Sequence, residues 1–355
     1  MKTAQSIYPL SQKQRQSNME LLRIIAMLLV LVVHSSWLSL GAPTYEEAHS
    51  QVALTLYRCW LPSISICCVN TFVMISGYFG INFSFRKLLS LLFQVAFYIL
   101  LIDIVILLFT DNYDIIEIIK LSLLHAEQYW FVKAYIMLML LAPGLNMFVK
   151  NSSRKQILVF LTLFYTLQTC YGWIFIGCGW FSMGYSPISF VGLYVLARYL
   201  RLYPLSIQNK YLYLLIFLIT SVLLCFAAYI MIYTDHSFYI LNLFFYTSPA
   251  AIMEAACLML FFQRIKIQSR LINWIASSAL SVYLLHANEL VLRDYYGKLI
   301  KSIFDNNSFI TYFVLTSLFI IVVFIISIFL DKFRIAIWNK LHRQWDVSGQ
   351  ISVEC

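Results

Sequence analysis

Charged residues are scarce in this chain. Asp, Glu, Lys and Arg together make up 12% of its 355 residues, whereas a soluble domain carries about 25%. Hydrophobic residues reach 61%, and the mean hydropathy is +0.79. So little polar surface excludes a soluble enzyme, a disordered chain and a collagen-like fibre, and it predicts a multi-pass membrane protein.

The sequence also lacks the patterns of a metal site or a nucleic-acid surface. Its eight cysteines form no CxxC pair, so neither a zinc site nor an iron–sulfur cluster is indicated. The net charge is +9, from 25 Lys and Arg against 16 Asp and Glu. In a membrane protein such an excess is more typical of basic cytoplasmic loops than of a partner nucleic acid.

Apolar runs long enough to cross a bilayer recur along the whole chain. A helix rises ~1.5 Å per residue, so a span needs ~20 mostly apolar residues. The sequence therefore predicts an all-α transmembrane helical bundle of about ten spans. The expected spans are residues 21–40, 63–81, 88–109, 129–148, 156–175, 188–203, 211–233, 239–262, 273–292 and 309–330.

The loops between these segments alternate in charge. Eighteen of the 25 Lys and Arg residues fall in the two tails and in every second loop, and five fall in the remaining loops. Positive residues favour the cytoplasmic side, so both termini are expected in the cytoplasm. The expected organisation is a cytoplasmic tail over residues 1–20, a transmembrane domain over 21–330 and a second cytoplasmic tail over 331–355.

Two ionisable residues in the first expected span are candidates for chemistry. Arg23 and His34 are eleven residues apart, which places them on one helix face about 16 Å apart along the axis. Ionisable residues inside a membrane usually face a polar cavity or a partner. An imidazole takes up and returns protons near neutral pH, so His34 is a candidate general base. The alternatives are an Arg23 that pairs with Glu20 at the interface and a purely structural His34.

Small and basic residues follow in the second span. Gly77 allows another backbone to approach closely, and Ser76 can form a hydrogen bond across helices, although helix packing alone would explain both. Arg86 and Lys87 come next, at the expected cytoplasmic end. Paired cations suit phosphate groups, but they equally suit the charge asymmetry of the loops.

Further candidates lie at the start of the fourth span. Tyr129 and Trp130 fall at the expected outer boundary, where an aromatic belt would explain them without any function. Lys133 lies one turn further inside, where it could face a cavity.

The ninth span also carries polar residues. His286 and Glu289 are three positions apart and would share one side of a continuous helix. Asp103 and Glu254 are lone carboxylates in other expected spans, and no pattern assigns either of them a role.

Taken together, these clusters resemble the acyltransferase-3 family of integral-membrane O-acyltransferases. Residues 18–34, with Arg23 and His34 separated by ten residues, are similar to the family's first-helix motif. Residues 72–78 resemble its second motif, although Val73 replaces a common phenylalanine. The resemblance covers nearly the whole chain and extends to three further segments: Arg86–Lys87, residues 129–146 and residues 283–286.

The resemblance implies an enzyme with no permanently bound cofactor. Its donor would be acyl-CoA, commonly acetyl-CoA, and its acceptor would be a hydroxyl of an exported or cell-surface glycan or of a lipid-linked saccharide. Arg23 and His34 would be essential to the transfer, and cytoplasmic cations would help to hold the donor. The expected location is a bacterial inner or plasma membrane, in contact with membrane lipid and not with nucleic acid.

The predicted topology orients the two substrates relative to His34. The donor phosphates are expected at the cytoplasmic mouth, and the acceptor is expected to arrive from the outer side. The expected donor-binding residues are Arg23, Arg86, Lys87, Ser76 and Gly77. The expected acceptor-binding residues are Tyr129, Trp130, Lys133, His286 and Glu289.

Two other functions fit the same residues. A transporter or flippase for lipid-linked sugars would use Arg23 and His34 to line a pathway, and broken helices in two inverted halves would indicate it. The sequence shows no matching pair of interrupted spans. A sensor that uses the fold without turnover is the third alternative.

Overall fold

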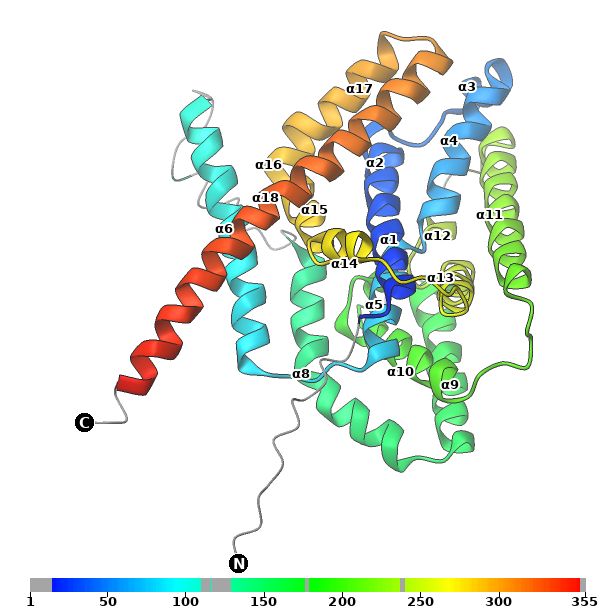
Figure 1. Ribbon diagram of the computed structural model, residues 1–355. Coiled ribbons are helices and arrows are strands. Elements are labelled where there is room, and N and C mark those ends of the chain that lie inside the picture. Colours follow the sequence, from blue (N-terminus) through cyan, green and yellow to red (C-terminus); the bar gives the residue numbers. More distant parts are fainter. Residues whose placement is uncertain (1–14, 110–115, 117–128, 176–178, 237–239, 352–355) are drawn as a thin grey trace, which may run out of the picture.

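The structure is all-helical. The computed structural model describes residues 15–109, 116, 129–175, 179–236 and 240–351, with side chains as far as Leu341. Every regular element in these residues is a helix, which confirms the predicted all-α class. Figure 1 shows the helices gathered into one bundle.

The first half of the described chain alternates long helices with short connecting ones. The elements are α1 (Ser17–Ser35), α2 (Trp37–Leu40), α3 (Tyr45–Ser50), α4 (Val52–Ser65), α5 (Cys68–Phe79), α6 (Phe85–Phe109), α8 (Trp130–Asn151), α9 (Arg154–Thr169) and the π-helical turn η2 (Cys170–Ile174).

The second half contains more short helices and ends in the longest one. The elements are η3 (Ser182–Gly184), α10 (Pro187–Leu202), α11 (Lys210–Tyr233), α12 (Ile240–Leu243), α13 (Pro249–Phe262), α14 (Arg270–Ala276), α15 (Ala279–His286), α16 (Glu289–Val291), η5 (Leu292–Gly297), α17 (Lys298–Asp305) and α18 (Phe309–Ile351).

Polar caps explain where several of these helices begin. The Thr44 side chain accepts from the backbone N–H of Glu47, whose carboxylate accepts in return from the Thr44 backbone, so α3 starts with a capping box. Ser153 and Gln156 form the same arrangement at the start of α9. Pro187 occupies the first turn of α10, where its missing N–H costs nothing.

Seven segments of the described chain are long and apolar enough to cross a membrane, or eight if one bent helix pair counts as a span. They coincide with seven of the ten expected spans, and the bent pair coincides with the ninth. The seven segments are Ser17–Leu40, Val52–Phe79, Phe85–Phe109, Trp130–Asn151, Arg154–Ile174, Lys210–Tyr233 and Phe309–Leu341.

The two remaining expected spans contain only short helices: α10 in residues 188–203, and α12 and α13 in residues 239–262. α10 has 16 residues and α13 has 14, which gives lengths of about 24 and 21 Å against a hydrocarbon core of about 30 Å. Figure 1 shows α13 nearly end-on, so its axis crosses the axis of its neighbour α11. The expected count of about ten therefore exceeds the number of full-length spans, because these two apolar helices pack among longer ones.

The ninth expected span is not one helix. α15 ends at His286 and the chain restarts at Glu289 with a bend of 67°. The Asn288 side chain caps the new helix by accepting from the backbone N–H groups of Leu290 and Val291, at 3.0 and 3.4 Å. An amide that competes for backbone hydrogen bonds thus breaks a segment whose apolar composition predicted a continuous helix.

The last span extends well beyond its expected end at residue 330, because α18 continues to Ile351. Asp331 and Arg334 form an ion pair that is almost fully buried, and Gln94 of α6 donates to the same carboxylate at 3.1 Å. The beginning of the expected C-terminal tail is therefore packed against the bundle, and no break in the backbone separates it from the last span.

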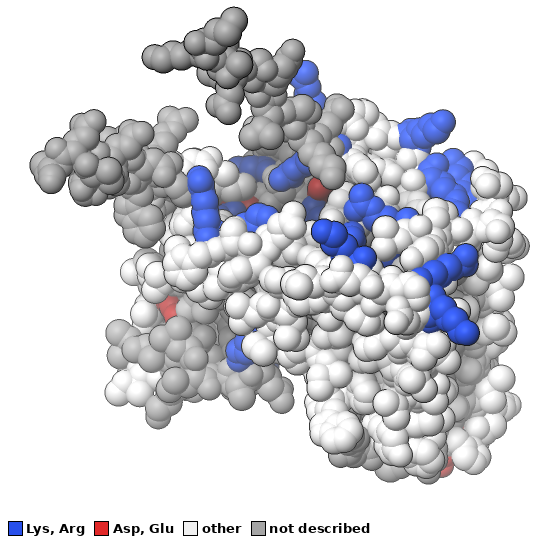
Figure 2. Space-filling view, turned by 90° about the horizontal axis from the view of Figure 1, so that it is seen from below, with Lys and Arg blue, Asp and Glu red and all other residues white. Residues whose placement is uncertain are grey.

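Lys and Arg gather on one side of the molecule. Figure 2 looks at the bundle from below and shows a face rich in Lys and Arg and poor in Asp and Glu. In Figure 1 the same side carries the start of α1, the start of α6, the corner between α8 and α9 and the end of α18. We call it the basic side and the opposite side the far side. The positive-inside rule predicts that the basic side faces the cytoplasm. A cytoplasmic location of both termini therefore remains a prediction.

Candidate active site

A narrow cavity opens between α1, α5, α8 and α15, with about 400 Å³ of empty space. Among the described residues that line it, His34 alone carries an imidazole, the side chain suited to a general base. The rest of the wall is apolar or aromatic. Its aromatic members are Phe72, Trp130, Phe131, Tyr246 and Tyr283.

His34 lies in the last turn of α1, where the apolar run of this helix gives way to two serines. Its Nδ1 lies 2.9 Å from Nε2 of His286, the last residue of α15. His286 is only 1% exposed and lies outside the cavity wall. The fold thus joins two predicted site residues that are 252 positions apart in the sequence, with His34 in the cavity wall and His286 buried beside it.

A chain of hydrogen bonds determines which nitrogen of His34 can act as a base. Nδ1 of His286 bonds to the carbonyl oxygen of Val282. A carbonyl can only accept, so this Nδ1 carries a hydrogen, and a neutral His286 then has an acceptor at Nε2. His34 must donate to that acceptor from its own Nδ1. Its Nε2 is left unprotonated and has no partner within the described part of the chain.

The bend after α15 separates two residues that the sequence placed on one helix side. His286 closes α15, whereas Glu289 opens α16 after the 67° change of direction. The expectation that they share a helix face is therefore wrong, because the capped break at Asn288 intervenes. Glu289 is half-buried and does not line the cavity.

Two aromatic residues at the start of α8 have different environments. Tyr129, in a left-handed backbone conformation (φ 51°), is buried and donates its hydroxyl hydrogen to the Leu284 carbonyl at 2.6 Å. It thereby ties α8 to α15. Trp130 lies in the cavity wall instead, with its ring 5.9 Å from that of Tyr246 and 4.4 Å from that of Tyr185.

Arg23 lies on α1 toward the basic side, outside the cavity wall. Its guanidinium forms an ion pair with Glu20, which is 5% exposed. This pairing is the one expected if Arg23 has a structural role at the membrane interface. The helix rise places Arg23 about 16 Å from His34 along α1.

The second motif packs against neighbouring helices. Ser76 Oγ lies 3.1 Å from the hydroxyl oxygen of Tyr135 on α8. A Cβ atom added at Gly77 would lie 2.6 Å from the Tyr194 carbonyl oxygen of α10. Gly77 therefore lets the α5 and α10 backbones touch, and it faces α10 rather than a channel.

The remaining predicted cations lie on the surface. Arg86 and Lys87 are exposed at the start of α6, and the Lys87 ammonium donates to the Asn82 carbonyl at 2.8 Å. Lys133 is exposed on α8. None of the three lines the His34 cavity, so the fold does not bring them next to the imidazole.

Tyr246 is one of the wall residues that the sequence analysis did not predict as part of the site. It belongs to the connection between α12 and α13 and reaches the cavity beside Trp130. The Asn70 side-chain amide of α5 donates to its backbone carbonyl at 2.9 Å and holds the connection in place. A lone tyrosine within an expected span gives no signal in the sequence, because only the tertiary fold places it near His34.

Comparison with known proteins assigns the chain to a family. The family model described as an acyltransferase domain matches residues 16–330, which is nearly the whole chain and includes every predicted site residue. No curated protein and no solved structure matches the chain significantly. The chain therefore belongs to the acyltransferase-3 family of membrane acyltransferases.

Proposed function

We propose that the protein transfers an acyl group, most simply acetyl, from acyl-CoA to a hydroxyl of an exported or cell-surface glycan, with His34 as the general base. The observation that carries this proposal is the hydrogen-bond chain from Val282 through His286 to His34. It directs an unprotonated imidazole nitrogen toward a narrow, mostly apolar cavity. A base held in this way suits a reaction that begins by removing a hydroxyl proton.

In the proposed reaction, Nε2 of His34 takes the proton of the acceptor hydroxyl as its oxygen attacks the thioester carbonyl. The carbon–sulfur bond of the tetrahedral intermediate then breaks, and the CoA thiolate leaves. The proton on Nε2 passes to the thiolate, which restores the neutral imidazole. His286 keeps Nδ1 of His34 bonded throughout, so we assign it a positioning role in place of direct contact with the acceptor.

We place the donor on the basic side. The phosphates of CoA cannot enter hydrocarbon without paired cations, and Lys and Arg gather on this side (Figure 2). Arg23, Arg86 and Lys87 remain the proposed phosphate ligands. The acyl arm would then reach His34 along the α1 face that carries Arg23, with Ser76 beside its path. Gly77 serves the helix crossing and needs no contact with the donor.

We place the acceptor hydroxyl at the aromatic part of the cavity. The Trp130 ring, in contact with Tyr246 and Tyr185, offers a flat face for a sugar ring. Tyr129 would hold Trp130 in position through its bond to α15. Lys133 and Glu289 remain proposed acceptor contacts outside the cavity wall.

One observation favours this reaction over transport. Transporters built from inverted repeats carry broken helices in corresponding positions of both halves. The described part of the chain has one bent helix pair, α15 with α16 and its continuation, and no second one. A single break next to His34 fits a catalytic site better than an alternating pathway.

Mass spectrometry of the surface glycan tests the proposal directly. Cells that express the protein should carry glycans with an added acyl mass, and cells that lack it should not. An unchanged glycan mass together with altered glycan export would favour a flippase. The membrane that we propose for the enzyme is a bacterial inner or plasma membrane.

A further inference from the structure

The far side of the bundle carries a second hollow, separate from the His34 cavity. It is an open groove where the junction of α3 and α4 meets the connection between α17 and α18, with about 1300 Å³ of empty space including the open solvent at its mouth. No residue lines both this groove and the His34 cavity. The polar residues that carry the argument below are Glu47, Gln51, Asp305, Asn307, Ser308 and Tyr312.

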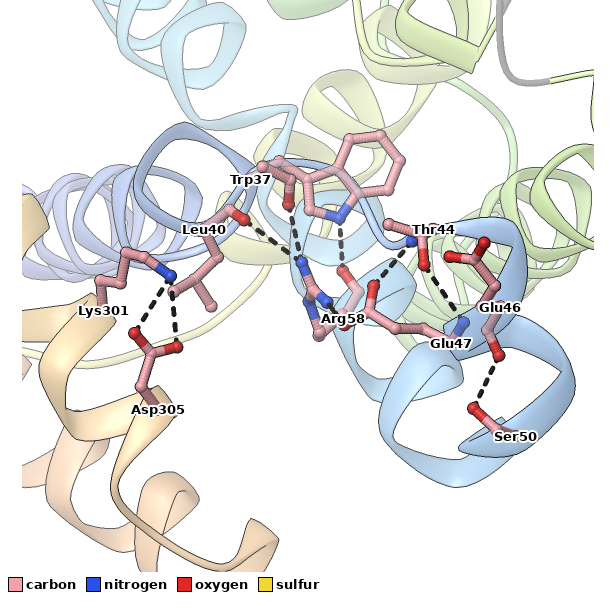
Figure 3. Close-up of polar contacts among 10 residues, drawn as sticks. Trp37, Leu40, Thr44, Glu46, Glu47, Ser50, Arg58, Lys301 and Asp305 are labelled. Atoms are coloured by element: carbon pink, nitrogen blue, oxygen red, sulfur yellow. Dashed lines mark hydrogen bonds and ion pairs between the residues drawn. The ribbon is translucent and has the colours of Figure 1, made fainter.

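Both carboxylates in this groove are already paired with cations. The buried guanidinium of Arg58 donates to Glu47 at 2.6 Å, and Lys301 lies 3.1 Å from Asp305. Figure 3 shows these pairs on opposite sides of Leu40, and no cation lines the groove among its described residues. The lining is therefore close to neutral overall but rich in hydrogen-bond acceptors, which disfavours anionic ligands and suits hydroxyl groups.

The Glu47 carboxylate is rigidly held. One oxygen accepts from Arg58, and the other accepts from the Thr44 backbone N–H at 2.7 Å in the capping box of α3. Arg58 also donates to the carbonyl of Gly41 at 3.0 Å. A carboxylate oriented by bonds on both oxygens loses little entropy when it accepts a further hydrogen bond.

A buried polar atom in the groove wall has no partner. The Tyr312 hydroxyl belongs to a side chain that is 1% exposed, and the described chain offers it no hydrogen bond. A buried hydroxyl without a partner is unfavourable, so a ligand that bonds to it gains affinity. Its ring packs at 5.2 Å against Phe304, which in turn stacks under Arg58 at 5.1 Å. The wall thus combines aromatic faces with an unpaired hydroxyl, an amide and hydroxyl groups.

The groove is connected to the end of the helix that carries His34. The Trp37 indole of α2 donates to the Arg58 carbonyl at 2.9 Å, and Arg58 holds the turn that follows α2. α2 begins two residues after α1 ends. A ligand in the groove would therefore lie against α3 and the start of α4, and Arg58 joins these elements to the turn after α2.

From this geometry we infer that the far-side groove binds an uncharged saccharide, namely a segment of the acceptor glycan beyond the sugar that receives the acyl group. The inference rests on the proposed function and specifies its substrate class. Neutralised carboxylates, an amide and the Tyr312 hydroxyl match the alternating donors and acceptors of sugar hydroxyls. The aromatic rings match the apolar faces of the sugar rings.

The test measures binding to the full-length protein in lipid nanodiscs. The probes are an array of short neutral hexose and N-acetylhexosamine oligosaccharides and matched oligosaccharides that contain uronic acid. Neutral probes should bind, and uronic-acid probes should bind more weakly. Tyr312→Phe and Asn307→Ala should each weaken neutral binding about two- to tenfold, the loss of one hydrogen bond. The exposed Tyr211→Phe on the opposite side is the matched control and should leave binding unchanged.

Three outcomes would overturn the inference: no neutral oligosaccharide binds, both groove variants bind as the wild type does, or the uronic-acid probes bind equally well. Thermal unfolding of each variant identifies a loss that merely reflects misfolding, and the two groove variants provide independent tests. His34→Ala separates this inference from the proposed function. It should retain saccharide binding while losing transfer, so normal transfer by His34→Ala would overturn only the proposed function.

Discussion

Replacing His286 tests how His34 becomes a base. His286 is buried, accepts from Nδ1 of His34 and packs its ring 5.5 Å from Tyr296. His286→Phe would preserve most of the side-chain volume and remove both ring nitrogens. His286→Gln would restore an acceptor oxygen that can bond to the His34 Nδ1–H. The pair of variants therefore separates packing from the control of the tautomer.

The structure gives two distinct magnitudes for this change. If the 2.9 Å contact were an ordinary anchoring bond, its loss would cost about 1 kcal/mol, or about fivefold in kcat. If it determines which nitrogen is free, its loss removes part of a general-base contribution worth about 10²–10⁴-fold. We expect His286→Phe to lower kcat by about 100-fold or more with little change in the KM for acyl-CoA, and His286→Gln to recover most of the loss.

Release of CoA during glycan acylation, followed in proteoliposomes at several pH values, measures both parameters. Binding of labelled acyl-CoA to each variant serves as the control for folding. A His286→Phe enzyme with kcat within about fivefold of wild type would refute tautomer control and leave only the anchoring bond. Equal losses in His286→Phe and His286→Gln would also contradict it, because only one of them lacks an acceptor.

Other predictions address packing, substrates and topology. Gly77→Ala should lower the melting temperature, since its Cβ would clash with the α10 backbone at a cost of about 1–3 kcal/mol. The control is Gly144→Ala, which has open space around it and should be neutral or stabilising. The double variant Arg86→Ala with Lys87→Ala should weaken acyl-CoA binding and spare acceptor binding, and Trp130→Ala should do the reverse. The opposite pattern in a binding assay would show that the donor and acceptor sides have been assigned wrongly. Reporters fused after α8 should read as cytoplasmic and those after α11 as external, and a reversed pair would invert the topology.

The helical class and most spans could be predicted because they depend on local composition. The apolar runs of α1 with α2, α6, α11 and α18 exceed the length that a bilayer requires, and no long-range contact is needed to find them. Composition alone could not separate a full span from a short buried helix such as α10 or α13. It also missed the break at Asn288, where a side-chain amide caps a new helix.

The site could be predicted only where one residue carries its own signal. His34 is conspicuous because an imidazole in an apolar helix is costly. The partnership with His286 depends on the packing of α15 against α1 and is invisible over 252 positions of sequence. Tyr246 and the Arg58–Glu47 pair could not be predicted for the same reason, since the tertiary fold alone brings each of them to its position.

The central claim is that His34 is the base for acyl transfer. The most direct measurement is the rate of labelled acetyl transfer from acetyl-CoA to purified surface glycan by reconstituted wild-type protein and His34→Ala. The account predicts that His34→Ala is inserted, binds acetyl-CoA and loses activity by about 10²–10⁴-fold. A well-folded His34→Ala protein that transfers acetyl at close to the wild-type rate would contradict it.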